Sequence, residues 1–405
     1  MILFRYLLFV FAVLKCHWFV SGSTITQQQK LAASDGTVED YFGVFGALDG
    51  DTAVVGAYLG DYKGSVYVFV RSGTTWTQQQ KLIANDGASS DWFGGSVALD
   101  GDTLVVGAYR DDDKGYDSGS VYVFVRSGTT WSQQQKLVAN DGAAKNEFGD
   151  SVALDGDTLV VGAYGDDDNG DDSGSVYVFV RSGTTWSQQQ KLVANDGVAD
   201  HRFGNFVALD GDTLVVGAYD SENASTSGSV YVFVRSGTTW SQQQKFVGSQ
   251  WFGAVVTLDG DTLVVGDSTD DDNGSTSGSV YIYVRSGTTW SQQQKLVASD
   301  GVAGDTFGVF VALDGDTAVV GAYGDDGYKG SVYVFALPPS SSGTPPPSDF
   351  LFKSTNAKNA KNKNTTSNII LQNRTSCVSN PKKSRLQPQT VAFTAVNRSR
   401  TVFRP

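Results

Sequence analysis

The stretch FGDSVALDGDTLVVGAYGDDDNGDDSGSVYVFVRSGTTWSQQQKLVAN, residues 148–195, decides the fold of this chain. Its alternation of side chains and its turn residues predict four short strands, namely Ser151–Leu154, Thr158–Ala163, Ser175–Arg181 and Trp186–Val193. Asp155 and Gly156 predict a two-residue hairpin turn between the first two strands, because Asp and Gly tolerate positive φ. No helical pattern of useful length is present, so the class is all-β.

The composition of the last two strands indicates how this unit packs. In the third strand valines alternate with Tyr177 and Phe179, so both faces are apolar. A sheet with one solvated face would alternate apolar with polar residues, so two apolar faces predict a sheet covered on both sides. The fourth strand has a polar centre, Gln188–Gln190, which suits an outermost edge strand protected against pairing with other molecules.

The same unit recurs six times along the chain. Phe-Gly pairs begin at Phe42, Phe93, Phe148, Phe203, Phe252 and Phe307, and fourteen residues after each Phe lies a further glycine, at Gly56, Gly107, Gly162, Gly217, Gly266 and Gly321. The period varies between 49 and 55 residues. A period of that length suits one four-stranded blade of a β-propeller and is too long for a helical solenoid unit.

Counting strands predicts how the propeller closes. The last repeat stops after its third strand, at Ser331–Phe335, and Thr24–Leu31 matches a fourth strand that precedes the first repeat. We therefore predict six four-stranded blades, with Thr24–Leu31 pairing beside Val332–Phe335 to close the ring. A seven-bladed propeller and an open arc are the alternatives.

The Phe-Gly and Gly-Ala signature resembles the FG-GAP repeats of the integrin α-subunit propeller. It is closer still to the FG-GAP-like repeats of secreted microbial and algal proteins, and it covers about residues 24 to 336. The resemblance implies a β-propeller in an extracellular protein, although a fold does not fix a function.

Three departures from the integrin pattern limit what the resemblance carries over. Integrin propellers have seven blades, and their Gly-Ala-Pro is here Gly-Ala-Tyr in five repeats and Gly-Asp-Ser at Gly266. Their calcium loop between the first and second strands is replaced by a tight Leu-Asp-Gly-Asp turn, such as Leu154–Asp157, which is too short to surround a cation with six or more oxygens. The family's calcium sites are therefore not expected here.

Both ends of the chain differ from the repeats. Residues 1–22 have the pattern of a secretory signal peptide, and residues 23–336 hold the propeller. Residues 337–405 begin with a Pro/Ser linker and continue as a basic tail with a composition typical of disorder. We expect a secreted or extracellular protein without a membrane span. The two cysteines, Cys16 and Cys377, lie outside the propeller, so no disulfide is expected in it.

Charge is divided along the chain and argues against one class of partner. Residues 23–336 hold 42 acidic and 17 basic side chains, a net charge of −25, whereas residues 337–405 have a net charge of +10. A domain this acidic is not expected to bind nucleic acid. We expect a monomer whose partner is an extracellular protein or glycan.

Variation among the repeats is concentrated in two sets of loops. The loops between the second and third strands differ from one another, as do those that lead from a fourth strand into the next Phe-Gly, and strand alternation predicts that both sets lie on one side of the ring. On this side we expect the ligand-binding residues Tyr41, Trp92, Trp251, His201 and Arg202. Packing of the aromatic side chains between blades is the alternative.

Two of these loops are rich in carboxylates, the ligands that calcium prefers. The candidate calcium ligands are Asp111, Asp112, Asp113, Asp117, Asp166, Asp167, Asp168, Asp171 and Asp172. Full calcium-loop spacing is lacking, so solvated loop carboxylates are the alternative. Glycosylation motifs occur at Asn223, Asn273, Asn364, Asn373 and Asn397.

The inventory of side chains argues against an enzyme. His201 is the only histidine outside the signal peptide, which excludes a histidine-based catalytic triad or metal centre in the propeller. A pair of carboxylates could still serve glycoside hydrolysis, and a structural role in a matrix or cell wall is a further alternative. We expect a recognition or adhesion module that has no catalytic residues and no cofactor beyond calcium.

Overall fold

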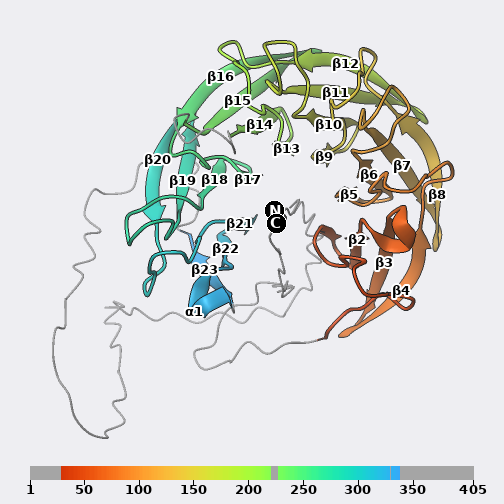
Figure 1. Ribbon diagram of the computed structural model, residues 1–405, viewed down its shortest axis with the longest axis horizontal. Coiled ribbons are helices and arrows are strands. Elements are labelled where there is room, and N and C mark those ends of the chain that lie inside the picture. Colours follow the sequence, from red (N-terminus) through yellow and green to blue (C-terminus); the bar gives the residue numbers. More distant parts are fainter. Residues whose placement is uncertain (1–28, 220–226, 329, 338–405) are drawn as a thin grey trace, which may run out of the picture. The chain divides into compact units, whose positions relative to one another are not determined.

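The computed structural model describes residues 29–219, 227–328 and 330–337. These residues form six antiparallel sheets that follow one another in chain order, a six-bladed β-propeller (Figure 1). Five sheets have four strands, and the sixth has three strands among the described residues. The all-β class and the six blades are confirmed. No helix in the described ranges is long and apolar enough to cross a membrane.

Within each blade the first strand lies innermost and the fourth outermost (Figure 1). The first strands are β1 (Gly46–Asp49), β5 (Ser96–Asp100), β9 (Val152–Asp155), β13 (Phe206–Asp210), β17 (Val255–Asp259) and β21 (Phe310–Asp314). The second strands are β2 (Thr52–Ala57), β6 (Thr103–Ala108), β10 (Thr158–Ala163), β14 (Thr213–Ala218), β18 (Thr262–Asp267) and β22 (Thr317–Ala322). The third strands are β3 (Ser65–Ser72), β7 (Ser120–Ser127), β11 (Ser175–Ser182), β15 (Ser229–Ser236), β19 (Ser279–Ser286) and β23 (Ser331–Ala336). The fourth strands are β4 (Thr75–Leu82), β8 (Thr130–Leu137), β12 (Thr185–Leu192), β16 (Thr239–Val247) and β20 (Thr289–Leu296), and two short helical turns are η1 (Gly60–Tyr62) and α1 (Asp325–Tyr328).

The strands of the third repeat agree with the sequence prediction to within one residue at each end. The first hairpin differs slightly, because Asp155 pairs with Thr158 and the two-residue turn is Gly156-Asp157. Gly156 has a φ of 59°, which a glycine adopts without strain. A β-bulge between β11 and β12 leaves Gln189 without a direct partner across the ladder. The same bulge recurs in the other four-stranded blades and bends the outer edge.

The hydrophobic cores lie between neighbouring blades rather than within one blade. One core cluster joins Val105 and Val123 of the second blade to Val161 of the third. Phe148 of the Phe-Gly pair is fully buried in this cluster, with its ring centroid 5.4 Å from that of Tyr177. Burying an aromatic side chain of this size contributes roughly 1.5–3 kcal/mol. The apolar faces predicted for the third strand are therefore covered by adjacent blades.

The glycines of the repeat signature allow blades to approach closely. A Cβ added to Gly107 would overlap the carbonyl oxygen of Gly149 in the next blade, and one added to Gly119 would overlap the backbone of Phe148. The Phe-Gly backbone of the second to sixth blades is therefore seated against two glycines of the preceding blade. This contact explains why Phe-Gly, the glycine of Gly-Ala-Tyr and the glycine before the third strand recur together.

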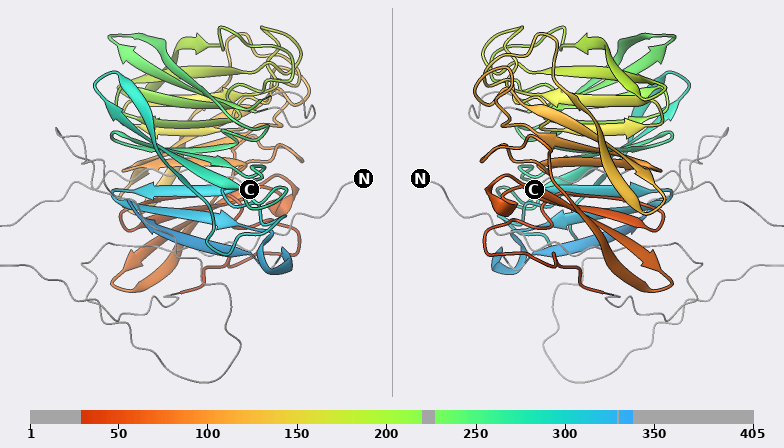
Figure 2. Two further views of the ribbon diagram at one scale, coloured as in Figure 1. Left: turned by 90° about the vertical axis from the view of Figure 1, so that its left-hand side faces the viewer. Right: turned by 90° about the vertical axis from the view of Figure 1, so that its right-hand side faces the viewer.

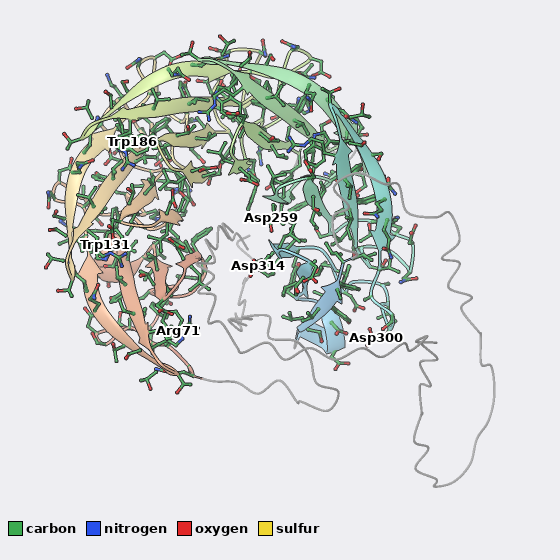
Figure 3. All side chains as sticks on the ribbon, turned by 180° about the vertical axis from the view of Figure 1, so that it is seen from behind. Arg71, Trp131, Trp186, Asp259, Asp300 and Asp314 are labelled. Atoms are coloured by element: carbon green, nitrogen blue, oxygen red, sulfur yellow. The ribbon has the colours of Figure 1, made fainter. Side chains whose placement is uncertain are left out.

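The side of the blades that carries the tight hairpin turns has the same contacts in successive repeats. The Gly156 N–H donates to Asp100 of the preceding blade at 2.7 Å, and Arg181 pairs with Asp157 at 2.7 Å. Arg181 also donates to Thr103 of the preceding blade at 2.9 Å. In Figure 3 Asp259 and Asp314, which correspond to Asp100, mark the inner ends of the fifth and sixth blades. The recurring Leu-Asp-Gly-Asp and Arg-Ser-Gly motifs thus link blades together.

The outer strands are joined by glutamine side chains. The Gln135 amide donates to the Trp186 carbonyl at 2.9 Å and accepts from the Trp186 N–H at 2.8 Å. The equivalent pairs are Gln29 with Trp76, Gln80 with Trp131, Gln190 with Trp240 and Gln244 with Trp290. Figure 3 labels Trp131 and Trp186 in these outer strands. The polar centre of the fourth strand therefore binds the next blade as well as limiting edge pairing.

The segment before the first repeat contacts the first blade. The Gln29 side chain binds the Trp76 backbone in the same way as the fourth-strand glutamine of one blade binds the tryptophan of the next. Leu31 and Ala33 pack against the core of the first blade. Residues 24–28 lie outside the described residues, so their pairing with β23 stays a prediction. In the described residues β23 pairs with β22 alone, and Val332 and Val334 are 47% and 49% exposed.

Candidate functional site

The two sets of variable loops lie on one side of the blades and are bound to each other. The Lys145 N–H donates to the Tyr116 carbonyl at 2.7 Å, and the Glu147 N–H donates to the Asp117 carbonyl at 3.1 Å. Other blades repeat these backbone bonds between a second-to-third loop and the loop entering the next Phe-Gly. Figure 2 shows the longer loops on one side of the blades and the hairpin turns on the other. The side chains of this face are therefore held on a connected frame.

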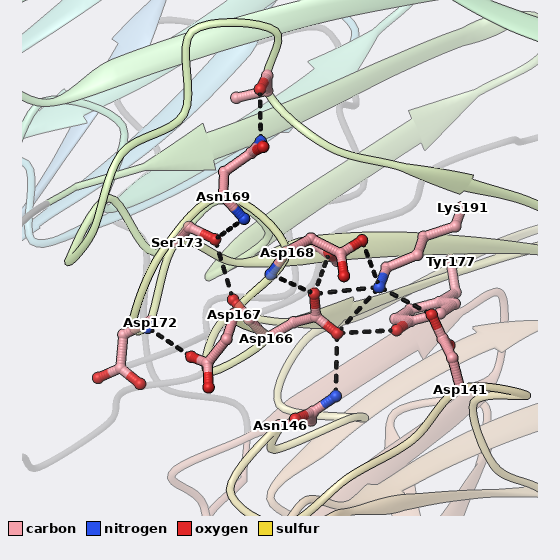
Figure 4. A network of polar contacts seen from close by, with 12 residues as sticks. Asp141, Asn146, Asp166, Asp167, Asp168, Asn169, Asp172, Ser173, Tyr177 and Lys191 are labelled. Carbon is pink, nitrogen blue, oxygen red and sulfur yellow. Dashed lines mark hydrogen bonds and ion pairs between the residues drawn. The ribbon is translucent and has the colours of Figure 1, made fainter.

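A lysine surrounded by carboxylates lies at the base of the variable loops (Figure 4). In the third blade the Lys191 Nζ lies 2.8 Å from Asp141, 3.1 Å from Asp166 and 2.8 Å from Asp168. The Tyr177 hydroxyl donates to Asp166 at 3.1 Å, and the Asn146 amide donates to the same carboxylate at 2.9 Å. We call this arrangement the lysine cage.

The pKa shifts in the cage show that its members hold opposite charges. Burial alone would lower the pKa of Lys191, but the hydrogen bonds that its ammonium donates to three carboxylates raise it well above the ordinary value. Burial alone would raise the pKa of Asp141, yet Lys191 holds it below its usual range. Burial and the charge of Asp166 raise the pKa of Tyr177, so its hydroxyl stays protonated and donates. The cage is therefore a compensated ionic network.

The cage recurs in other blades. The lysine pairs with carboxylates as Lys81 with Asp35 and Asp61, Lys136 with Asp86, Asp111 and Asp113, Lys245 with Asp196, and Lys295 with Asp270 and Asp272. Four of the expected calcium ligands, Asp111, Asp113, Asp166 and Asp168, thus face an ammonium group.

The other expected calcium ligands lie farther out in the same loops. The Asp112 carboxylate accepts from the Asp117 N–H at 2.7 Å, and that of Asp167 accepts from the Asp172 N–H at 2.8 Å. Asp171 is exposed and contributes its carbonyl to the Asp200 N–H. Within residues 29–219, 227–328 and 330–337 no group of three or more His, Cys, Asp or Glu is placed to hold a metal. Calcium binding stays a prediction from the sequence.

A second feature of this face is a fixed position just before five of the six Phe-Gly pairs. Tyr41, Trp92, Glu147, Arg202 and Thr306 occupy it with φ values of 54°, 59°, 53°, 47° and 56°. Positive φ is unfavourable for such side chains, so the surrounding structure must impose it. Five different side chains are therefore displayed with the same backbone geometry, while the rest of the repeat is nearly constant.

The tyrosines of the Gly-Ala-Tyr motif connect these positions. Tyr58 lies 5.3 Å from Tyr41 in its own blade and 5.2 Å from Trp92 in the next, measured between ring centroids. Tyr109 lies 5.3 Å from Trp92, edge to face. The Arg110 guanidinium lies 3.8 Å above the Trp92 ring. The rings of the first two blades thus form one continuous row.

Similar contacts, some with charged members, occur in the next blades. Arg202 lies 5.6 Å from the Tyr164 ring, and burial together with the neighbouring Glu147 raises the pKa of Tyr164. In the fourth and fifth blades Tyr219 lies 5.0 Å from Trp251. We call the whole set the aromatic belt, and its members are Tyr41, Tyr58, Trp92, Tyr109, Arg110, Glu147, Tyr164, Arg202, Tyr219 and Trp251.

Four of the five predicted ligand-binding residues belong to the belt, and His201 does not. His201 is buried with its ring 6.1 Å from that of Tyr231, beside a cavity of about 220 Å³ that Asp196 and Lys245 also line. Tyr41 is 40% exposed, whereas Trp92 is half-buried between two tyrosines and Trp251 is half-buried beside Tyr219. These aromatic residues therefore pack between blades and still keep part of their surface open to solvent.

Sequence reasoning missed the tyrosines and Arg110. Their signal was the recurrence of Gly-Ala-Tyr at the point where each variable loop begins. Among the glycosylation candidates, Asn273 is exposed, and its amide donates to the Ala298 carbonyl at 3.4 Å. Asn223, Asn364, Asn373 and Asn397 lie outside the described residues.

Comparison with known proteins agrees with the repeat structure. The family model for the FG-GAP repeat matches residues 25–69, 76–124, 131–179, 186–233, 240–283 and 290–335. Among curated proteins, none matches the chain. A solved structure from Lactobacillus plantarum is 16% identical over 78% of this chain and 89% of its own, with a TM-score of 0.47. A proposed 6-phosphogluconolactonase from Bacteroides uniformis is 12% identical over 72% of this chain and 84% of its own, with a TM-score of 0.44. Both TM-scores are below 0.5, so neither likeness bears on function.

Proposed function

The chain belongs to the FG-GAP repeat family, and on that premise we propose that it is an extracellular recognition module whose aromatic belt binds a glycan. FG-GAP repeats are typical of extracellular proteins, and the signal-like segment at residues 1–22 supports export. Adhesion to a surface or matrix that bears the glycan is the biological role we propose. The module binds its ligand without turning it over.

The observation that carries this proposal is the row of ring contacts that joins the first two blades, together with the similar contacts in later blades. Neighbouring rings from Tyr41 to Tyr109 lie 5.2 to 5.3 Å apart, and the belt resumes at Tyr164 and Tyr219. Aromatic faces pack against the apolar faces of sugar rings, and tyrosine hydroxyls supply hydrogen bonds at the rim. A row of rings therefore suits a chain of several sugar units.

The frame beneath the belt favours binding by a preorganised surface. Backbone bonds join the variable loops, and left-handed φ values fix the positions of Trp92 and Arg202. A ligand that meets side chains already held in place loses less conformational entropy than one that must order them. Variation at these fixed positions also allows different sugar units to be distinguished along one chain.

A glycan array probed with the full-length protein tests the proposal. The double variant Trp92→Ala with Trp251→Ala removes rings from two distant parts of the belt. We expect it to weaken binding at least tenfold, since aromatic residues are the dominant contributors at such surfaces. The control is Tyr116→Ala, which removes a 64% exposed ring outside the belt and should leave affinity unchanged.

Equal binding by the double variant and the wild type would reject the belt as the binding surface. Capture of a matrix protein in place of any glycan, with the same dependence on Trp92 and Trp251, would instead identify a protein ligand. Release of shortened oligosaccharides during incubation would favour the carbohydrate-active alternative over a binding module.

A further inference from the structure

Arg110 differs from the other arginines in its ion pairing. Among the residues that the structure describes, six of seven arginines form ion pairs with aspartate, and Arg110 does not. The pairs are Arg71–Asp51, Arg126–Asp102, Arg181–Asp157, Arg202–Asp172, Arg235–Asp212 and Arg285–Asp261. In a domain with a net charge of −25, an arginine without a carboxylate partner is a distinctive feature.

The surroundings of Arg110 hold its guanidinium in place. Its backbone N–H donates to the Asp91 carbonyl at 3.3 Å, and its guanidinium lies 3.8 Å above the Trp92 ring. The side chain is half-buried, and its Nε is buried without a hydrogen-bond partner. Stacking on an indole occupies the face of a guanidinium and leaves its edge for two parallel hydrogen bonds to a carboxylate or sulfate.

We propose that Arg110 is an anion subsite of the belt, which receives the carboxylate or sulfate of an acidic saccharide. The sugar ring that bears this group lies along the Tyr58 and Trp92 end of the belt. This inference rests on the proposed function, because it assigns the ligand class of the same surface. An acidic peptide could satisfy the guanidinium, but the row of rings leading away from Arg110 suits consecutive sugar units better.

Net charge limits how acidic the saccharide is. A uniformly charged polyanion would be repelled by a domain with 42 acidic and 17 basic residues. A chain of mostly neutral sugars with an occasional acidic unit would bind Arg110 through that unit and would be repelled little by the carboxylates of the domain. The ligand class is therefore a sparsely charged acidic glycan.

The fold restricts this subsite to the second blade. Arg110 directly follows the Gly-Ala-Tyr tyrosine, and Leu59 and Thr269 hold that position in the first and fifth blades. At Gly165 and Gly324, in the third and sixth blades, an added Cβ would overlap the backbone of the adjoining loop. Those two blades cannot present a side chain there without moving the loop.

Calorimetry with the full-length protein and matched saccharides tests the inference. The probes are a galactan hexasaccharide that carries one galacturonic acid unit, its methyl ester, a singly sulfated hexasaccharide and the neutral hexasaccharide. We expect Arg110→Gln to weaken binding of the acid or the sulfate by about tenfold to a hundredfold, because a charge-assisted hydrogen bond is lost. Binding of the methyl ester and the neutral sugar should weaken much less than that of the acid or the sulfate, because neither forms an ion pair with Arg110.

Lys114→Gln is the matched control, since it removes the same charge from an exposed residue of the same loop. Equal losses for Arg110→Gln and Lys114→Gln would overturn the subsite, because long-range charge alone would then explain them. Arg110→Lys should recover only part of the affinity, since lysine cannot form the paired hydrogen bonds. Melting curves for each variant establish that it is folded.

The remaining outcomes separate the two proposals. If the wild type binds all four saccharides equally, the anion subsite is rejected while glycan recognition stands. If no saccharide binds but a glutamate-rich peptide does, and Arg110→Gln abolishes that binding, the saccharide class is rejected together with the glycan function. Preference for the acid over the sulfate, or the reverse, identifies which anion the subsite accepts.

Discussion

Replacing Lys191 with Met is the most direct test of the lysine cage. The change keeps most of the apolar stem and removes an ammonium group that lies within 3.1 Å of Asp141, Asp166 and Asp168. Three carboxylates then face one another without a counter-charge. We expect a loss of about 2–4 kcal/mol in the free energy of unfolding, worked out from the burial of each pair.

The magnitude comes mainly from Asp166, whose side chain is 4% exposed. Breaking a fully buried ion pair costs about 3–5 kcal/mol, but Asp166 keeps hydrogen bonds from Tyr177 and Asn146, which lowers the cost. Asp141 and Asp168 are 48% and 52% exposed, so each of their pairs adds only about 0–1 kcal/mol.

Urea unfolding followed by tryptophan fluorescence measures the loss. The control is Asp157→Asn, which breaks the pair of Arg181 with a side chain that is 70% exposed but keeps the hydrogen bond from Arg181 to Thr103, and it should cost less than about 1 kcal/mol. Adding Asp166→Asn to Lys191→Met removes the uncompensated buried charge and should recover part of the stability. The reasoning is refuted if Lys191→Met costs no more than the control, or if the second change recovers nothing.

The effect should also depend on pH in a defined direction. Lys191 holds the pKa of Asp141 below its usual range against the effect of burial. A carboxyl group whose pKa is lower in the folded state stabilises the fold above its unfolded pKa of about 4 and loses that contribution as the pH falls through the folded value. The difference between the wild type and Lys191→Met should therefore shrink below about pH 4. A difference that grows in acid would contradict this assignment.

Three further predictions follow from other contacts. Gln135→Ala removes two hydrogen bonds to the next blade's backbone and should cost about 1–3 kcal/mol in urea unfolding, whereas Ser132→Ala, at an exposed position of the same strand, should be nearly neutral. Gly162→Ala places a Cβ against the backbone of the next blade, so we expect loss of soluble protein or of the cooperative melting transition; a normal melting curve would count against the close approach. Millimolar Ca²⁺ should raise the melting temperature of Lys191→Met, because three carboxylates are then left without the ammonium, and an unchanged melting temperature would show that they cannot converge on a cation.

Much of the fold could be predicted because each repeat carries its own local signals. The strand Thr158–Ala163 was predicted with the bounds it has in the structure, since alternation and flanking turn residues are local properties. The hairpin turn was misplaced by one residue, because Asp155 and Asp157 both suit turns and only strand pairing decides between them. Prediction of the site was less complete: the residue before Phe-Gly was identified in Tyr41, Trp92, Arg202 and Trp251, but not the tyrosines that join them.

The sequence by itself determined the number of blades, the order of strands and the side on which variation lies, because periodicity and turn residues are local properties of the sequence. Tertiary structure alone decided which charges meet. Lys191 and Asp141 are 50 residues apart, and Tyr58 reaches Trp92 across a blade boundary. Such contacts depend on how adjacent blades stack, so the same aspartates that suggest a calcium loop in the sequence face a lysine in the fold. Within the described part of the chain, the lack of an aspartate partner at Arg110 is likewise a property of the stacked blades.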